Sequence, residues 1–188
     1  MHPFILFEGV DGTGKSTAAE SVSKEAGFVY LHSPPDALVP FRKHFDGLDP
    51  DICLNFYLMG NNIMNSIVGK TLEREPVALD RHFPSTVAFH SEVFGMNLDP
   101  YINQMKPWPN RIYYLFGDPD VLIQRAGEIT KSDSRSRGTG FMREYAEHYE
   151  RIFSGRPEVV RIDTTRMDKD EVREYVVDDL KRAGLFRG

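Results

Sequence analysis

The sequence predicts an α/β fold: a five-stranded, doubly wound parallel sheet flanked by helices, in one domain over residues 1–188. Two observations support this prediction. Five short apolar runs alternate with segments of helical periodicity along the chain. The first run also leads into a glycine-rich sequence and then a helix, which is the strand–loop–helix context of a phosphate-binding loop.

The first strand is expected at Phe4–Phe7, four apolar residues that are typical of a strand buried on both faces. The helix after it carries small apolar residues on one face and ends at Gly27, a favourable residue just beyond a helix. Residues 28–31 form the second expected strand. Residues 32–35 must be a loop, because two consecutive prolines fit neither a helix nor a central strand.

Residues 36–48 are expected to form a short helix or an irregular connection. Asp49 then predicts the start of a helix, because a capping carboxylate is followed by proline in the first turn. The apolar pattern carries this helix to about Leu72. Residues 76–79 are short and apolar, and they form the third expected strand.

The remaining elements are expected in the order helix, strand, helix, helix, strand and helix, at 85–94, 111–116, 119–126, 141–153, 159–162 and 168–183. Residues 95–109 form a long, proline-containing connection. Residues 127–140 are polar and lack periodicity, which predicts a mobile loop. One face of the helix after this loop is expected to pack in the core through Phe141, Tyr145, Tyr149 and Ile152.

Composition narrows the class of protein. The chain has 188 residues, 40% hydrophobic and 27% charged, as in an ordinary globular domain. Its net charge of −5 argues against a nucleic-acid polymer or an anionic membrane as partner. Cys53 is the single cysteine, which excludes an internal disulfide, and no apolar run approaches membrane-spanning length. A cytoplasmic location is therefore expected.

The strongest motif is Gly9-x-x-x-x-Gly14-Lys15-Ser16, the spacing of a phosphate-binding loop. Glycines let successive backbone N–H groups point at phosphate oxygens, at the positive end of a helix dipole. Lys15 is expected to reach the transferred phosphoryl group, and Ser16 to ligate Mg²⁺. ATP contacts are expected from the whole loop, at Gly9, Val10, Asp11, Gly12, Thr13, Gly14, Lys15, Ser16 and Thr17.

Two further groups of charged residues accompany this motif. Asp80 and Arg81 follow the third strand, at the edge of a parallel sheet where ligands bind. Asp80 is expected to help hold Mg²⁺ and Arg81 to clamp an oxyanion, although an ordinary ion pair is the alternative. Arg135 and Arg137 lie in the polar loop, which predicts a lid over residues 127–140 that closes on phosphate; the alternative is an inert surface loop.

Three stretches resemble the thymidylate kinase family. They are Phe7–Thr17, Asp80–His90, and a weaker series that runs from Asp118 through Arg125 to Phe141–Tyr149. The resemblance covers nearly the whole chain and implies a P-loop kinase fold with a lid. It implies transfer of the γ-phosphoryl group of ATP to a deoxynucleoside monophosphate, dTMP giving dTDP, with Mg²⁺ as cofactor. It also implies a homodimer.

The resemblance assigns roles to residues that match the family's motifs. Asp11 would accept a hydrogen bond from the sugar 3′-hydroxyl, and Asp80 with Arg81 would sit at the acceptor phosphate and the metal. Ser85 belongs to the same acceptor motif, and Phe89 would lie under the deoxyribose. Arg125 would contact ATP. Gly12 stands where some members carry an arginine, so the basic groups of the lid, Arg135 and Arg137, become the catalytic candidates.

The chain departs from the family pattern at two places. Members usually carry Phe-x-x-x-Arg on the helix before the Asp-Arg strand, to stack on and hydrogen-bond thymine. The matching region here offers Phe56 but no arginine, so Asn61 or Asn62 is the candidate base reader. The usual Arg-Glu-Pro after the second strand is also missing, which makes Arg42 a candidate contact for the acceptor phosphate.

Three alternatives remain open from the sequence. A deoxynucleoside kinase, or a kinase for another monophosphate, fits the missing arginine; a nucleoside hydroxyl would need Glu8 or Asp80 as base. A GTP-hydrolysing switch is suggested by Thr130–Asp133, which resembles a guanine-reading tetrad but does not follow a strand. The third alternative is a nucleotide-binding module without catalysis, which would need fewer charged residues.

Overall fold

The computed structural model describes residues 2–129 and 133–186, with side chains described outside 126–137. Its centre is a parallel five-stranded sheet in the order β2-β3-β1-β4-β5. The predicted five parallel strands are confirmed, and β1, which leads into the phosphate loop, occupies the middle. The strands are β1 (Phe4–Glu8), β2 (Val29–His32), β3 (Val77–Asp80), β4 (Arg111–Phe116) and β5 (Val159–Asp163).

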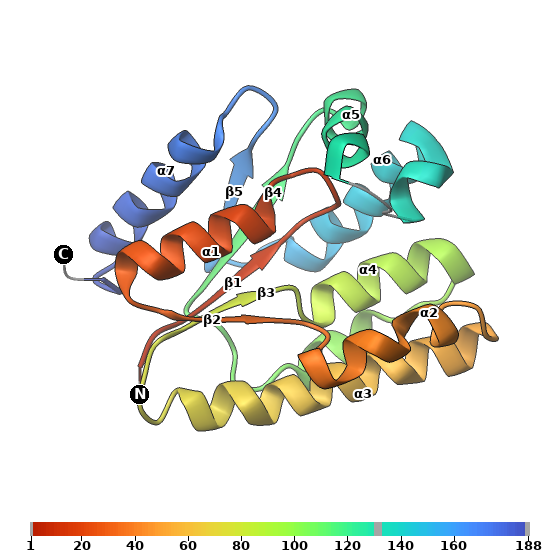
Figure 1. The fold of residues 1–188 in the computed structure, drawn as a ribbon, viewed down its shortest axis with the longest axis horizontal. Coiled ribbons are helices and arrows are strands. Elements are labelled where there is room, and N and C mark those ends of the chain that lie inside the picture. Colours follow the sequence, from red (N-terminus) through yellow and green to blue (C-terminus); the bar gives the residue numbers. More distant parts are fainter. Residues whose placement is uncertain (1, 130–132, 187–188) are drawn as a thin grey trace.

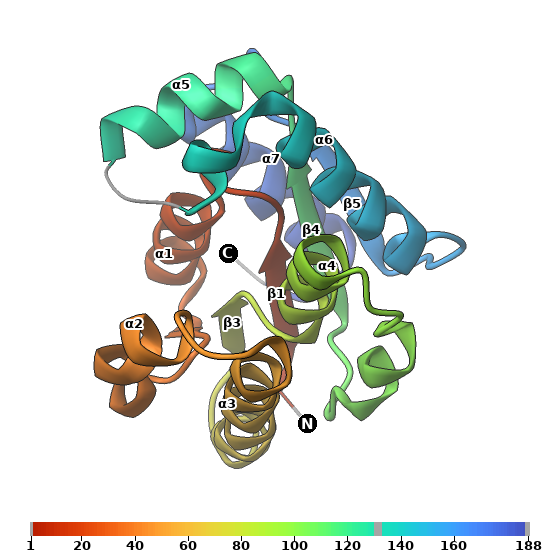
Figure 2. The same ribbon diagram turned by 90° about the vertical axis from the view of Figure 1, so that its right-hand side faces the viewer.

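Helices cover both faces of the sheet (Figure 1). Alternate residues of β1 divide between two cores, as the two-residue period of a strand requires. Ile5 and Phe7 pack with α1 (Lys15–Ala26) and α7 (Lys169–Arg182). Phe4 and Leu6 face the opposite core, which is built by α3 (Pro50–Thr71), α4 (Phe83–Phe94), α5 (Pro119–Ile129) and α6 (Asp133–Phe153). Figure 2 shows α1 and α4 on opposite sides of the sheet.

Short helices fill two connections. Residues 36–48, expected as a short helix or irregular segment, form a 3₁₀ turn, η1 (Asp36–Phe41), followed by α2 (Arg42–Phe45). The long proline-containing connection holds another 3₁₀ turn, η2 (Asp99–Gln104). None of the helices in the described part of the chain combines the length and apolar content needed to cross a membrane.

Most predicted boundaries differ from the structure by a residue or two, and β4 matches at both ends. The helix α3 begins at Pro50 as expected, but the Asp49 side chain accepts no capping hydrogen bond. A capping box occurs instead at α7. There the side chain of Asp168 accepts hydrogen bonds from backbone N–H groups, and the side chain of Glu171 accepts one from the backbone N–H of Asp168.

The loop expected over 127–140 is wrong for the described backbone. α5 continues to Ile129, and α6 begins at Asp133 with one non-helical residue inside it, Gly138, at φ 82° and ψ −179°. The segment is polar and has no helical repeat of apolar residues. Packing of α5 against α6 nevertheless stabilises helical structure there.

Candidate active site

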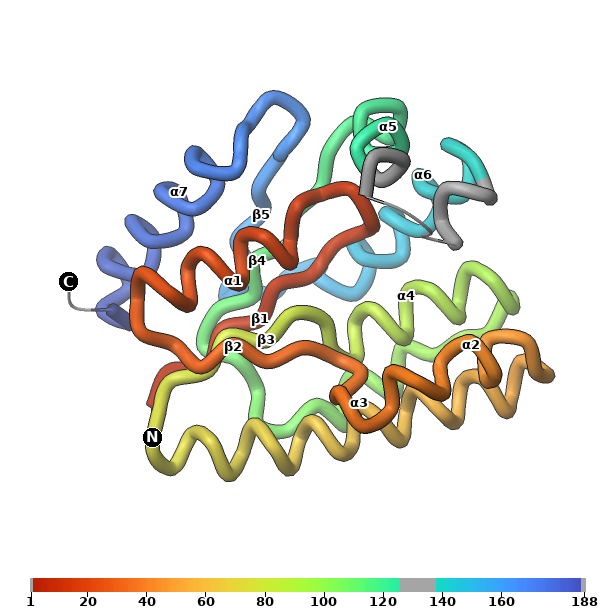
Figure 3. The backbone as a smooth tube through the Cα atoms, in the orientation of Figure 1, coloured from red at the N-terminus to blue at the C-terminus, as the bar shows by residue number. Residues whose placement is uncertain are grey.

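The backbone between β1 and α1 forms the predicted phosphate-binding bend, which Figure 3 shows as the red turn leading into α1. Gly9 and Gly12 have φ values of +144° and +83°. A Cβ at Gly9 would lie 2.1 Å from the Leu115 carbonyl oxygen, and one at Gly12 would lie 2.2 Å from that of Leu122. Only glycine fits both the conformation and the space, so the bend is fixed by its backbone.

Lys15 lies within this bend and is 5% exposed. Its Nζ donates to the Val10 carbonyl at 3.3 Å and pairs with the Asp11 carboxylate at 3.5 Å. Burial, reinforced by repulsion from Arg81, lowers the pKa of Lys15, while the neighbouring carboxylates raise it. The bend therefore presents one nearly desolvated cation beside its backbone amides.

Arg81 connects the end of β3 to the bend. Its backbone φ is +67°, in the left-handed region that a non-glycine residue rarely adopts. Its guanidinium donates to the Asp11 carboxylate, to Ser85 Oγ at 3.0 Å and to the Gly9 carbonyl at 3.4 Å. The guanidinium group of Arg81 is therefore in direct contact with the phosphate loop.

Asp80, the residue before it, is 6% exposed. Its Oδ2 accepts from the Tyr30 hydroxyl at 3.5 Å. Its Oδ1 is buried and accepts no hydrogen bond from the residues that the structure describes. A buried carboxylate oxygen without a partner is costly unless a ligand completes it, so Asp80 retains capacity for a metal ion or a metal-bound water.

A cavity of about 820 Å³ opens at these strand ends. Asp11, Ser16, Asp80 and Arg81 line what we call the anion end of the cavity. Cys53, Tyr57, Phe89 and His90 also line it, from α3 and the later turns of α4, and we call them the ring end. The cavity thus joins phosphate-binding groups to an aromatic wall, as a nucleotide site requires.

His90 is the central group of the ring end. The centroid of its ring lies 5.2 Å from that of Tyr57 and 5.4 Å from that of Phe89. Its Nδ1 donates to the Thr86 carbonyl at 2.8 Å, because a carbonyl can only accept, and its Nε2 lies 3.6 Å from Cys53 Sγ. Burial lowers the pKa of His90, so the ring is neutral at pH 7 and Nε2 is an acceptor.

Arg42 also lines the cavity, from α2. Its Nε donates to the Tyr57 hydroxyl at 3.3 Å, and that hydroxyl donates to Asp46 Oδ1 at 2.7 Å. The guanidinium lies 6.0 Å from the Tyr57 ring centroid. Tyr57 of α3 therefore holds the Arg42 side chain at the cavity.

Comparison with known sequences gives the family. Residues 7–176 match the family profile described as Thymidylate kinase. The chain belongs to the thymidylate kinase family. A probable thymidylate kinase of Picrophilus torridus is 24% identical over 94% of this chain and 92% of its own length. Another, of Methanocaldococcus jannaschii, is 26% identical over 95% of each chain.

Comparison with solved structures agrees on the fold. The structure of thymidylate kinase from Candida albicans matches 98% of this chain and 93% of its own, with a TM-score of 0.80 at 18% identity. The chain therefore has the P-loop kinase fold, as the phosphate loop and the alternating strands predicted.

Within the family's acceptor motif, the structure brings Arg81, Ser85 and Phe89 to one cavity, together with Asp11 of the loop. The candidates taken from α3 lie elsewhere. Phe56 is buried at 3% exposure with its ring stacked on Phe45, 4.3 Å between centroids, so it does not face the cavity. The aromatic residue of α3 that lines the cavity is Tyr57, and the base contact assigned to Phe56 stays a prediction.

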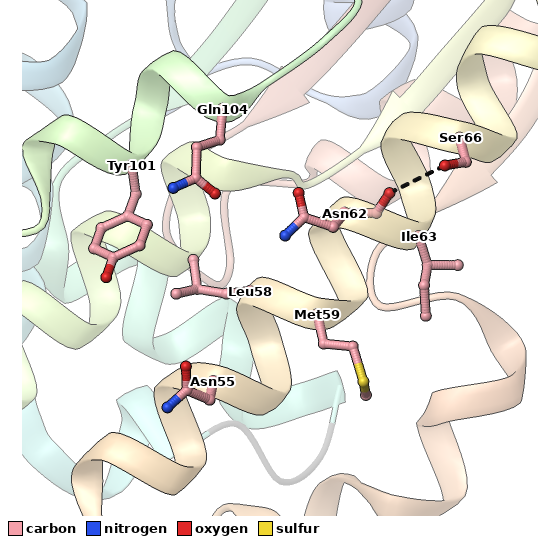
Figure 4. Close-up of a pocket in the computed structure, with 8 residues that line it drawn as sticks. All are labelled: Asn55, Leu58, Met59, Asn62, Ile63, Ser66, Tyr101 and Gln104. Carbon is pink, nitrogen blue, oxygen red and sulfur yellow. Dashed lines mark hydrogen bonds between the residues drawn. The ribbon is translucent and has the colours of Figure 1, made fainter.

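The two asparagines differ from their expected placement as well. Asn61 is buried behind the cavity wall, where its amide donates to Thr86 Oγ1 at 2.8 Å and its Oδ1 accepts from Ser33 Oγ at 3.2 Å. Asn62 is exposed and lines a separate hollow of about 540 Å³ on the outer face of α3, with Tyr101 and Gln104 (Figure 4). Neither amide is presented to the acceptor cavity.

Sequence analysis missed the residues that α3 does present, Cys53 and Tyr57. Their four-residue spacing is that of one helix face, as is the spacing of Thr86 and His90 on α4. This periodicity was the available signal, but apolar residues occur on several faces of α3, so the pattern alone did not select one.

The arginines assigned to the donor side remain predictions. Arg125 donates to the carbonyls of Thr164 at 2.8 Å and Thr165 at 3.1 Å, so it secures the turn after β5. The side chains of Arg135 and Arg137 lie outside the described residues. So does most of the Thr130–Asp133 tetrad, whose described part is the first residue of α6.

Proposed function

We propose that this chain transfers the γ-phosphoryl group of ATP to dTMP, giving dTDP. The observation that carries the proposal is the single cavity in which the phosphate loop and the Asp80–Arg81 strand end face the aromatic wall of α3 and α4. Phosphoryl transfer depends chiefly on positioning and charge neutralisation. This arrangement supplies both, with Lys15 beside the donor phosphates and Arg81 beside the acceptor.

The acceptor phosphate would be held by Arg81 and Arg42, the arginines among the described residues that line the cavity. Its oxygen is already ionised near neutral pH, so the reaction needs no strong general base. Glu8 is unsuited to that role, because it is fully buried and its oxygens accept hydrogen bonds from Ser85, Tyr149 and the His82 amide. This placement leaves Asp80 as the base that the nucleoside-kinase alternative would need.

Mg²⁺ would be held by Ser16 and Asp80. The residues fit such an ion, because Oδ1 of Asp80 is buried without a protein partner and both side chains line the same cavity. No cluster of three acidic, histidine or cysteine ligands occurs in the described residues, which suits an ion held by one or two protein groups and substrate phosphates. The ion would neutralise charge on the transferred phosphoryl group.

The nucleoside would lie against the ring end, with Phe89 under the deoxyribose and the base near Tyr57 and His90. We propose His90 in place of Asn61 or Asn62 as a base-reading group. Within the described part of the chain, its Nε2 lone pair faces a weak thiol donor at 3.6 Å, and the N3–H of thymine is a stronger donor.

The test is ADP release with ATP and Mg²⁺ across deoxynucleoside monophosphates and their parent nucleosides. We expect dTMP to give the highest kcat/KM and thymidine to give little turnover. Turnover of thymidine without dTMP would select the nucleoside kinase, and acceptor-independent hydrolysis that prefers GTP would select the switch. N3-methyl-dTMP, which lacks the proposed donor, should be a poorer acceptor by about 10-fold, the value of one such hydrogen bond.

Two further parts of the proposal follow from family membership. The lid arginines, Arg135 and Arg137, would neutralise the transferred group. A homodimer would use the outer face of α3, where Ile52, Met59 and Ile63 are exposed at helical spacing. Light scattering should give twice the 21.5 kDa chain mass, and Ile63→Lys should shift it to the monomer; a wild-type monomer would contradict the dimer.

A further inference from the structure

Glu8 is the last residue of β1 and is completely buried, although it is ionisable. Its carboxylate receives hydrogen bonds from three places in the fold. Oε1 accepts from the His82 backbone N–H at 2.8 Å. Oε2 accepts from the Ser85 hydroxyl at 2.5 Å and the Tyr149 hydroxyl at 3.1 Å. One side chain therefore joins β1, the start of α4, and α6.

The first of these bonds acts on the backbone of Arg81. The Arg81 N–H still belongs to the sheet, donating to the Phe7 carbonyl at 3.0 Å. The next amide along the chain, that of His82, turns away to the Glu8 carboxylate. Between these two anchors Arg81 takes its left-handed φ of +67°, a strained conformation that persists only where the surroundings hold it. Glu8 supplies the second anchor.

The second bond acts on the side chain of Arg81. The Ser85 hydroxyl donates its proton to Glu8 Oε2 at 2.5 Å. Its oxygen lone pair is then available to Arg81, whose NH1 donates to Ser85 Oγ at 3.0 Å. The hydroxyl orientation is set by Glu8, and the guanidinium orientation follows from it.

We propose that Glu8 is a positioning residue of the transfer site, which aims the Arg81 guanidinium at the acceptor phosphate through the Arg81–His82 backbone and the Ser85 hydroxyl. The inference rests on the proposed function, because it takes the acceptor to be a nucleoside monophosphate. Glu8 itself touches no substrate in this role. Its effect should therefore appear in acceptor binding and depend on Arg81.

The experiment compares Glu8→Leu with Glu8→Gln in the full-length protein. Leucine offers no acceptor, so acceptor KM should rise about 10- to 100-fold, the loss expected for a misplaced charged hydrogen bond, while KM for ATP stays unchanged. Glutamine keeps a carbonyl for the His82 amide and should restore most of the acceptor affinity. In an Arg81→Ala background, Glu8→Leu should add no further loss, because the group it positions is gone.

Thermal melting checks that each variant is folded. If Glu8→Leu does not fold, Ser85→Ala removes the side-chain link and should raise acceptor KM. Ser91→Ala is the matched control, because this buried serine of the same helix has no hydrogen-bond partner among the described residues. A folded Glu8→Leu protein with wild-type acceptor KM, or losses that simply add to those of Arg81→Ala, would overturn the proposal. A wild-type protein inactive on dTMP would instead count against the proposed function.

Discussion

The two ends of the cavity are built in different ways. The anion end is fixed by backbone geometry and by hydrogen bonds within the phosphate loop and between neighbouring strand ends, as at Gly9 and Arg81. The ring end depends on how α3 and α4 are rotated about their axes, because its contacts are between side chains such as Tyr57 and His90. The proposed phosphate site therefore depends on local sequence, whereas the proposed base site depends on tertiary packing.

The largest expected effect is at the anion end. Lys15→Ala should reduce kcat by at least about 1,000-fold, because it removes the desolvated cation that neutralises the transferred phosphoryl group. ADP release measures the loss, and circular dichroism with thermal melting should show an intact fold. A purified Lys15→Ala protein with near wild-type activity would contradict the proposed role of Lys15 at the transferred phosphoryl group.

The next effect concerns Glu8, the buried carboxyl group that is connected to Arg81 of the anion end through Ser85. Burial raises the pKa of Glu8 from 4.5 to about 7, although hydrogen bonds from Ser85 and the His82 amide oppose the rise. Between those two values the folded state binds more protons than the unfolded chain. The free energy of unfolding contributed by Glu8 therefore falls as pH rises through this window, by about 3 kcal/mol in total.

Urea unfolding of the wild-type and Glu8→Gln proteins at pH 5 and pH 7 measures this contribution. The stability difference between the two proteins should favour the wild type more at pH 5. His82 and His90, whose pKa values are lowered by burial, titrate in the opposite sense, but both proteins contain them and their contribution cancels. An identical pH dependence in the two proteins would show that Glu8 is already ionised at pH 5.

The smallest effects test the register of α3. Tyr57→Phe removes the hydroxyl that holds Arg42, and acceptor KM should rise about 5- to 10-fold, the value of one net hydrogen bond. Phe56→Leu should leave acceptor KM unchanged and lower the free energy of unfolding by about 1 kcal/mol, through the lost stack on Phe45. The reverse pattern in steady-state kinetics and urea unfolding would restore Phe56 as the base contact.

Sequence reasoning succeeded where a short stretch determines its own geometry. The spacing of Gly9 and Gly14 specified the bend, and the polar residues after a buried strand specified the position of Arg81. It failed where orientation comes from distant packing. Phe56 and Tyr57 are adjacent aromatic residues, and the packing of α3 decides which of them lines the cavity. The loop predicted over 127–140 is wrong for the same reason in the described residues 127–129 and 133–140, where helix–helix contact outweighs composition.

The direct ion pair between Asp11 and Arg81 has a consequence for selectivity among small anions. A free phosphate that attracts the guanidinium leaves the carboxylate without its counter-charge. A nucleotide carries an anion and a sugar hydroxyl on one rigid scaffold, so it can compensate both partners at once. Under the proposed function, the pair would therefore favour molecules that carry both groups at the right separation over lone anions.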